Sequence, residues 1–213
     1  MMQTHTLLLT SAELQLVTAL SGIRRALLFQ PAEPADRTGQ IQAVCRLIRD
    51  GFLLQNDRGL AASPSLLPFV RALGRADTVT AARPREAGVP SLCIYHDRAD
   101  REFAVICPHE NRADTFKLYL SDEAALIDEL EAVRLLPAPH DREIVLRGAP
   151  DGPRGKDDLL VCFERYCLAA ASCVDRLSIF RASPAWGIAI CSPAGEELAY
   201  YHRDRFAGWL KGN

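Results

Sequence analysis

Two stretches of the chain repeat the same order of apolar and polar positions. The first covers residues 103–130 and the second covers residues 187–210. In each, an apolar run that ends in Cys-Pro or Cys-Ser-Pro is followed by a polar turn, a second run with alternating apolar residues, and a helical segment. In the first copy the alternating apolar residues are Phe116, Leu118 and Leu120, and their two-residue period is typical of a half-buried strand. The pattern predicts an α+β fold built from two similar units of antiparallel sheet plus helices.

The segments around these two stretches complete the units. A strand is predicted before each copy, at Leu92–His96 and at Leu177–Arg181. A long helix from about Lys156 to Cys173 is predicted to open the second unit, and a strand is predicted at Glu143–Leu146. The Gly- and Pro-rich run at 148–155 lies between them and is the expected junction. The predicted units are therefore residues 77–148 and residues 149–213.

The N-terminal residues 1–76 have a different pattern. Thr10 and Glu13 are placed as a capping box for a first helix, and a second helix is predicted to begin at Thr38 after a Pro-rich loop at 31–34. Its apolar residues are expected to face the core, namely Ile41, Val44, Cys45 and Ile48. A hairpin that turns at Asn56-Asp57 and a helix after Pro64 follow. Helix, helix, hairpin and helix is the order of a winged-helix module.

Composition narrows the class of protein. The chain has 213 residues, 48% hydrophobic and 24% charged, which is ordinary for a globular protein. A net charge of −2 does not provide the basic field that binds nucleic acid non-specifically, so nucleic acid is disfavoured as a partner. The sequence contains no long uninterrupted apolar run and no N-terminal secretion signal, which predicts a cytoplasmic protein without a membrane span. The seven cysteines lie mostly in apolar runs and are expected to be reduced and buried.

Candidate chemical motifs do not assemble into a catalytic or metal site. Cys107 and His109 lack the paired spacing of a structural zinc site, and a turn explains them. The glycine run at 148–156 lacks the Gly-Lys-Ser/Thr ending of a phosphate loop. The acids near residues 110–123 are explained by a turn and a helix start. The sequence therefore predicts a protein that is not an enzyme and that carries no cofactor or metal.

Exposed aromatic residues are the candidates for a binding surface. Tyr119 is expected on the strand face opposite Leu118, and Tyr201 on the face opposite Tyr200. Both are predicted to point outward and, with the loop at 149–155, to border a partner site. The alternative is the hairpin turn, through Asn56 and Asp57.

The order and texture of the chain resemble the EspG-type chaperones of type VII (ESX) secretion. That family opens with a strand and an amphipathic helix, as Leu7–Leu20 does, and continues with a helix that breaks at a glycine, as residues 47–52 do. A helix such as Ser63–Leu73 follows, and the family closes with a hairpin whose turn resembles Ser192–Gly195 and with a short helix. The resemblance implies a quasi-two-fold fold and a cytoplasmic chaperone or adaptor that binds a helical secreted client.

Two functions from different classes follow from these patterns. One is a non-enzymatic chaperone or adaptor for a helical secretion client. The alternative is a winged-helix transcription regulator or another DNA-associated regulatory protein, with Arg46 and Arg49 on the second helix as its basic face. The sequence leaves open the client and the oligomeric state, a dimer included.

Overall fold

The protein is an α+β protein in which helices pack on both faces of one large antiparallel sheet. The computed structural model describes residues 6–23, 36–57, 59–97, 99, 102–138, 149–152, 158–170, 172–182 and 185–212. Within these ranges the helices are α1 (Ser11–Leu20), α2 (Arg37–Arg49), α3 (Leu67–Arg75), α4 (Glu123–Ala132) and α5 (Arg203–Lys211). The strands are β1 (Thr6–Thr10), β2 (Leu53–Asn56), β3 (Gly59–Ala62), β4 (Thr78–Pro84), β5 (Leu92–His96), β6 (Glu102–Pro108), β7 (Thr115–Asp122), β8 (Leu159–Cys167), β9 (Ser172–Ala182), β10 (Ala185–Ser192) and β11 (Gly195–Tyr200). The predicted fold class is confirmed.

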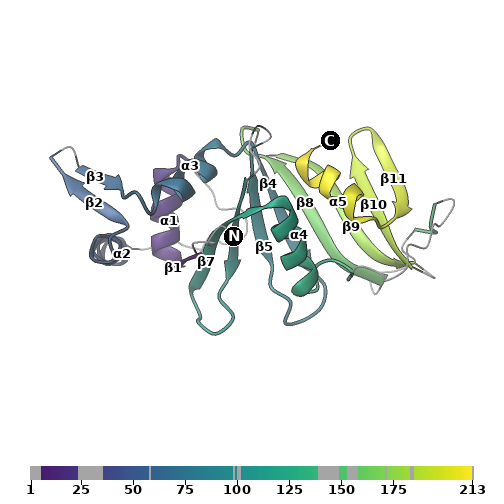
Figure 1. Cartoon of the computed structure of the whole chain (residues 1–213), viewed down its shortest axis with the longest axis horizontal. Helices are drawn as coiled ribbons and strands as arrows, with labels where there is room; N and C mark the ends of the chain where they lie inside the picture. Colours follow the sequence, from purple (N-terminus) through teal and green to yellow (C-terminus); the bar gives the residue numbers. More distant parts are fainter. Residues whose placement is uncertain are drawn as a thin grey trace.

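Nine of the strands form one continuous sheet. Their order is β1-β7-β6-β5-β4-β8-β9-β10-β11, and every neighbouring pair is antiparallel. Strands β4 to β7 form one meander that leads into α4, and strands β8 to β11 form another that leads into α5 (Figure 1). The two meanders join through β4 and β8, where Ala81 lies opposite Glu164. Three statements about this architecture remain predictions. They are that the two units superpose, that they are separate domains, and that residues 1–76 form a winged-helix module.

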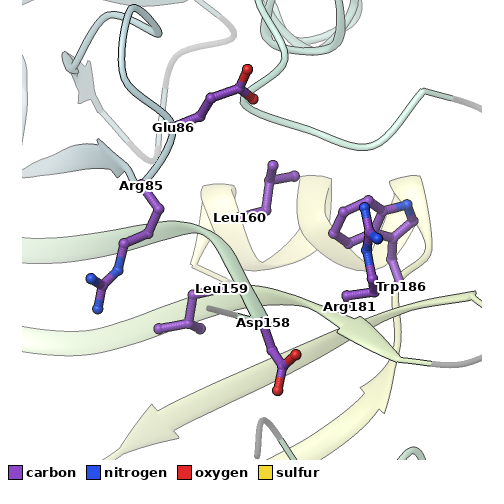
Figure 2. A pocket seen from close by; sticks show the side chains of 7 residues that line it. All are labelled: Arg85, Glu86, Asp158, Leu159, Leu160, Arg181 and Trp186. Carbon is purple, nitrogen blue, oxygen red and sulfur yellow. The ribbon is translucent and has the colours of Figure 1, made fainter. Parts of the chain in front are cut away.

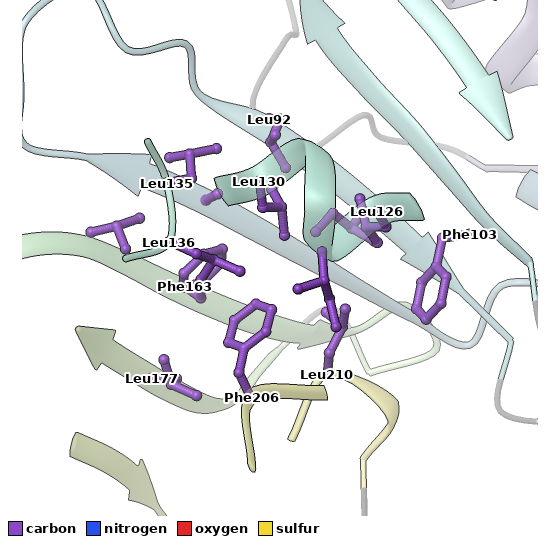
Figure 3. Packing of buried hydrophobic residues seen from close by; sticks show 14 of the residues in the cluster. Leu92, Phe103, Leu126, Leu130, Leu135, Leu136, Phe163, Leu177, Phe206 and Leu210 are labelled. Atoms are coloured by element: carbon purple, nitrogen blue, oxygen red, sulfur yellow. The ribbon is translucent and has the colours of Figure 1, made fainter. Parts of the chain in front are cut away.

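One face of the sheet is covered by α4 and α5. Their apolar side chains meet those of both meanders in a single core, in which Leu126, Phe163 and Phe206 are completely buried (Figure 3). Arg203, at the start of α5, pairs with Glu131 near the end of α4 at 3.7 Å, and Lys211 pairs with Glu123 at 2.9 Å. These contacts place the two helices antiparallel to each other. The core therefore connects the two meanders.

The other face is covered by α1 and α3 over the first meander only. Leu14 and Val17 of α1 and Phe69 of α3 pack there with apolar side chains of β4 to β7. Over the second meander, the corresponding cluster of described residues comes from β8 to β11 and is centred on Phe180. Gly152 also reaches this cluster, because a Cβ atom on it would lie 3.7 Å from Leu198. The described helices therefore cover this face unevenly.

The predicted helix at Lys156–Cys173 is wrong, because its described part contains β8. Along β8, Val161, Phe163 and Arg165 are buried while the residues between them are half-buried, which is the two-residue period of a strand. The predicted strand at Glu143–Leu146 and the Pro-rich loop at 31–34 lie outside the described residues.

The predicted inward face of the second helix is also wrong. Helix α2 buries Ala43 and Leu47, whereas Ile41 is 55% exposed and Cys45 is exposed. The residues Ala43 and Leu47 are four apart and form a narrower apolar stripe, against which α1 packs. The face that contains Ile41 is left to solvent.

The prediction that the cysteines lie in the core holds for only part of the set. Cys93 and Cys107 are buried, Cys162 and Cys167 are half-buried, and the remaining three are exposed, namely Cys45, Cys173 and Cys191. All seven are free thiols. None of the helices in the described ranges has both the length and the apolar character that a membrane span requires.

Candidate protein-binding surface

The exposed apolar residues gather at the N-terminal end of the chain. Among the described residues, all the large hydrophobic side chains that are exposed lie between positions 8 and 60, namely Leu8, Leu20, Ile41, Leu54 and Leu60. Three of them, Ile41, Leu54 and Leu60, belong to α2 and to the β2–β3 hairpin. We call these two elements, residues 37–62, the N-terminal arm. Figure 1 shows the arm at one end of the molecule, with β11 near the opposite end.

The arm has a small anchor that holds it on the sheet domain. Ala43 and Leu47 of α2 and Leu53 of β2 are at most 2% exposed. Helix α2 ends at Arg49, and Gly51, just beyond its C-cap Asp50, has a φ of +75° that suits glycine. The backbone N–H of Phe52 then donates to the carbonyl of Leu47 at 2.8 Å. The hairpin therefore starts directly from the end of α2 in a fixed direction.

A charged contact fixes α2 against α1. The guanidinium of Arg46 lies 3.1 Å from the carboxylate of Glu13 and donates to the hydroxyl of Thr10 at 3.2 Å. Glu13 also accepts the backbone N–H of Thr10 at 2.7 Å, so the predicted capping box is present. Arg49 pairs with Asp50 at 3.1 Å. Both arginines of the predicted basic face are thus in contact with an acid of this chain.

The two hairpin residues predicted as a binding site lie at the tip of the arm. Asn56 and Asp57 are exposed at the turn between β2 and β3, and Asn56 lies opposite Gly59. Leu54 is 48% exposed on β2 and Leu60 is 43% exposed on β3. The tip therefore combines polar turn residues with exposed leucines on both strands.

Tyr119 and Tyr201, which were predicted to border a partner site, lie on the face of the sheet that α4 and α5 cover. Tyr119 is only 6% exposed, so its predicted outward position is wrong. Burial and a hydrogen bond to Glu129 of α4 raise the pKa of Tyr119 above its ordinary value. Tyr201 is half-buried against the same core, and burial raises the pKa of its hydroxyl as well. Helices cover the sheet on both faces at β7, so Leu118 and Tyr119 are both buried.

The structure also contains two concave regions. A cleft of about 550 Å³ lies at the β9–β10 end of the sheet, where the guanidinium of Arg181 is 5.6 Å from the ring of Trp186 (Figure 2). Arg85 and Glu86 border it, and Glu86 pairs with Arg134 at 3.8 Å. Of the loop predicted to border the client, residues 149–152 are described and residues 153–155 are not. Figure 2 shows the charged side chains of the cleft pointing in different directions, so they do not converge on one point.

The second concave region is a groove of about 770 Å³ between α4 and α5. Its floor includes His96 and Phe103, whose rings stack with centroids 4.5 Å apart. In the described part of the chain, no three His, Cys, Asp or Glu side chains are grouped as metal ligands would be. Burial raises the pKa of the Cys107 thiol to about 11, which keeps it protonated at neutral pH. His109 accepts the backbone N–H of Asn111 at 3.1 Å in the turn after β6.

Comparison with protein-family models and with curated protein sequences gave no match. The arm was only partly visible in the sequence, through the hairpin turn. The exposed position of Ile41 could have been noticed from Ala43 and Leu47, which form an alternative apolar stripe on the same helix.

Proposed function

We propose that this protein is a non-enzymatic chaperone or adaptor that binds a helical segment of another protein, and that the N-terminal arm is its docking surface. The proposal rests on one observation: of the five exposed large hydrophobic side chains in the described part of the chain, three, Ile41, Leu54 and Leu60, belong to the arm. Exposed apolar groups that gather in one region are typical of surfaces that bind other proteins. The resemblance to the EspG-type chaperones favours a secretion client and a cytoplasmic location.

A helical partner suits the shape and chemistry of the arm. An amphipathic helix binds by laying its apolar side chains against an apolar surface, with a few anchors supplying most of the free energy. Ile41 on α2 and Leu54 on β2 are the proposed anchors, and Asn56 and Asp57 at the tip provide polar groups for the rim. Leu60 lies opposite Gln55, so its side chain is on the other face of the hairpin from Leu54. The arm is held on the domain by its buried residues, so its exposed residues can change without loss of the fold.

Binding in cells provides the test of this proposal. A tagged wild-type protein and the double variant Ile41→Glu/Leu54→Glu would be expressed in the native organism, and the captured proteins quantified by mass spectrometry. The proposal expects one or a few helical proteins with wild type and an at least tenfold loss with the variant, which corresponds to about 1.4 kcal/mol of binding free energy. Recombinant co-purification with the captured protein, and its circular dichroism, would establish that the interaction is direct and the partner helical.

Leu20→Glu is the matched control, because Leu20 is 41% exposed on α1 outside the arm. It is expected to capture the same partner as wild type. Equal capture by the arm variant and by wild type would refute the proposed docking surface.

The DNA-binding alternative makes a different prediction. Binding to phosphates would weaken steeply as salt rises, because counterions are released on binding. The contacts of Arg46 with Glu13 and of Arg49 with Asp50 reduce the basic field of α2. An interaction with duplex DNA that has such a salt dependence and that is lost in Arg46→Ala would favour this alternative.

A further inference from the structure

The two edge strands of the large sheet differ in how they are protected. An edge strand offers backbone N–H and C=O groups to another chain, and proteins usually blunt such edges with charges, prolines or bulges. The edge strand β11 begins with a glycine and carries Glu196 and Glu197. The edge strand β1 has the sequence Thr-Leu-Leu-Leu-Thr, without a charge, a proline or a glycine, and its register with β7 is continuous. The residues of β1 themselves therefore supply none of these protections, and the charged side chains of Glu13 and Arg46 contact only its last residue, Thr10.

The side chains of β1 suit a strand that pairs on both sides. Leu7 and Leu9 are at most 5% exposed and pack in the core beneath α1 and α3. Leu8 points to the other face of the sheet and is 43% exposed. A second strand beside β1 would cover Leu8 and would extend the apolar layer formed by Leu7 and Leu9.

The backbone of β1 has groups that point away from β7. The N–H of Thr10 donates to the Glu13 carboxylate at 2.7 Å, so it points away from the neighbouring strand. This N–H is already bonded within the chain, so it is not a donor for a second strand. In a strand the backbone groups of residues two apart point to the same side. The N–H and C=O of Leu8 therefore also point outward from the sheet edge.

The sequence of β1 reads the same in both directions. When such a strand pairs antiparallel with its own copy about Leu8, Thr6 lies opposite Thr10, Leu7 opposite Leu9, and Leu8 opposite itself. Apolar residues then meet apolar residues on both faces. When a strand pairs with its own copy about a two-fold axis, any charged residue comes near the same residue of the other copy. The uncharged β1 would therefore pair without repulsion. A self-paired β11 would instead bring the carboxylates of both copies together along one edge.

We propose that β1 is a dimerisation edge, on which two copies of this chain pair antiparallel through Leu8 and join their sheets into one. Leu8 and its counterpart in the second copy exchange both backbone hydrogen bonds at the two-fold axis. This surface is separate from the proposed docking surface on the arm, so either can fail without the other.

Sedimentation velocity over a range of protein concentrations is the first test. Wild type is expected to shift from monomer to dimer as concentration rises, and Leu8→Lys is expected to remain monomeric because it sets two ammonium groups opposite each other. Leu54→Lys is the matched control, since Leu54 has a similar exposure of 48% on the arm, and it is expected to dimerise like wild type. A protein that is monomeric throughout, or a dimer that Leu8→Lys leaves intact, overturns the proposal.

Cysteine cross-linking tests the register. Directly opposed residues that exchange hydrogen bonds in an antiparallel pair have Cα atoms about 5.5 Å apart, which is within the range of a disulfide. In a background with the three exposed cysteines changed to serine, Leu8→Cys is expected to form a covalent dimer under mild oxidation. Thr6→Cys is the control, because its counterpart lies roughly 13 Å away along the strand. Equal cross-linking of the two variants would contradict the proposed pairing.

Discussion

Removal of the Asp175 charge should destabilise the protein strongly, because Asp175 neutralises an arginine inside the second meander. The guanidinium of Arg165 on β8 donates to the carboxylate of Asp175 on β9, and both side chains are 9% exposed. The same guanidinium donates to the carbonyl of Trp209 and lies 5.0 Å from the centre of its ring. Arg165 therefore connects β8, β9 and the end of α5.

The expected magnitude follows from the burial of the pair. Breaking a buried ion pair leaves one charge without compensation and costs about 3–5 kcal/mol. For a chain of this size, that loss lowers the melting temperature by about 6–20 °C. Asp175→Asn keeps the shape and one acceptor, so it isolates the charge, and Asp175→Ala should cost at least as much.

Chemical denaturation followed by tryptophan fluorescence measures this loss, since Trp209 lies directly on Arg165. Arg83→Ala is the control for an exposed pair: Arg83 contacts Glu164 at 3.0 Å, but its side chain is 53% exposed, so the loss should be below about 1 kcal/mol. The double variant Arg165→Met/Asp175→Leu should recover most of the stability that Asp175→Ala loses, because no buried charge remains. If Asp175→Asn costs no more than Arg83→Ala, the reasoning from burial is refuted.

Two further predictions concern the face of strands β8 to β11 that lies opposite α4 and α5 and carries the Phe180 cluster. Gly187→Ala should destabilise the protein by about 1–3 kcal/mol in the same denaturation assay, since a Cβ atom there would overlap the tip of the completely buried Phe180 ring. An unchanged stability would show that the ring can move aside. Burial tends to raise the pKa of Glu164, but hydrogen bonds from Tyr166 and Arg83 outweigh it and lower that pKa below its ordinary value. The carboxylate therefore stabilises the folded state above about pH 4.3, the ordinary pKa of a glutamate. This contribution is lost as the pH falls through the lower pKa of the folded state. Glu164→Gln should therefore flatten the loss of stability on acidification, measured as unfolding free energy from pH 6 to pH 3, and an unchanged slope would contradict the assignment.

The elements that depend on local sequence signals could be predicted. The capping box of Thr10 and Glu13, the hairpin turn at Asn56-Asp57 and the alternation in β7 are all present. Each of these depends on residues within a few positions of one another. Local patterns are therefore enough to give the fold class and most of the elements.

The side of an element that faces the core could not be predicted in the same way. Tyr119 and Leu118 alternate correctly on β7, but α4 covers one face and α1 with α3 cover the other, so both residues are buried. On α2 the partner helix selects Ala43 and Leu47 over the larger Ile41. These choices depend on contacts between distant parts of the chain, which periodicity alone does not report.

The uneven covering of the sheet explains why the two proposed surfaces lie at the same end of the molecule. Both α4 and α5 are needed to fill the core that joins the two meanders, so they leave little apolar area exposed there. Helices α1 and α3 cover the first meander on the other face, and in the described part of the chain α2 packs mainly against α1 and the start of the hairpin. An element that packs on one side only leaves its other side exposed, as α2 does at Ile41 and as β1 does at Leu8 on the sheet edge. Apolar exposure at this end is therefore a consequence of the topology, and the two proposals use different parts of it: the arm for a client and β1 for a second copy.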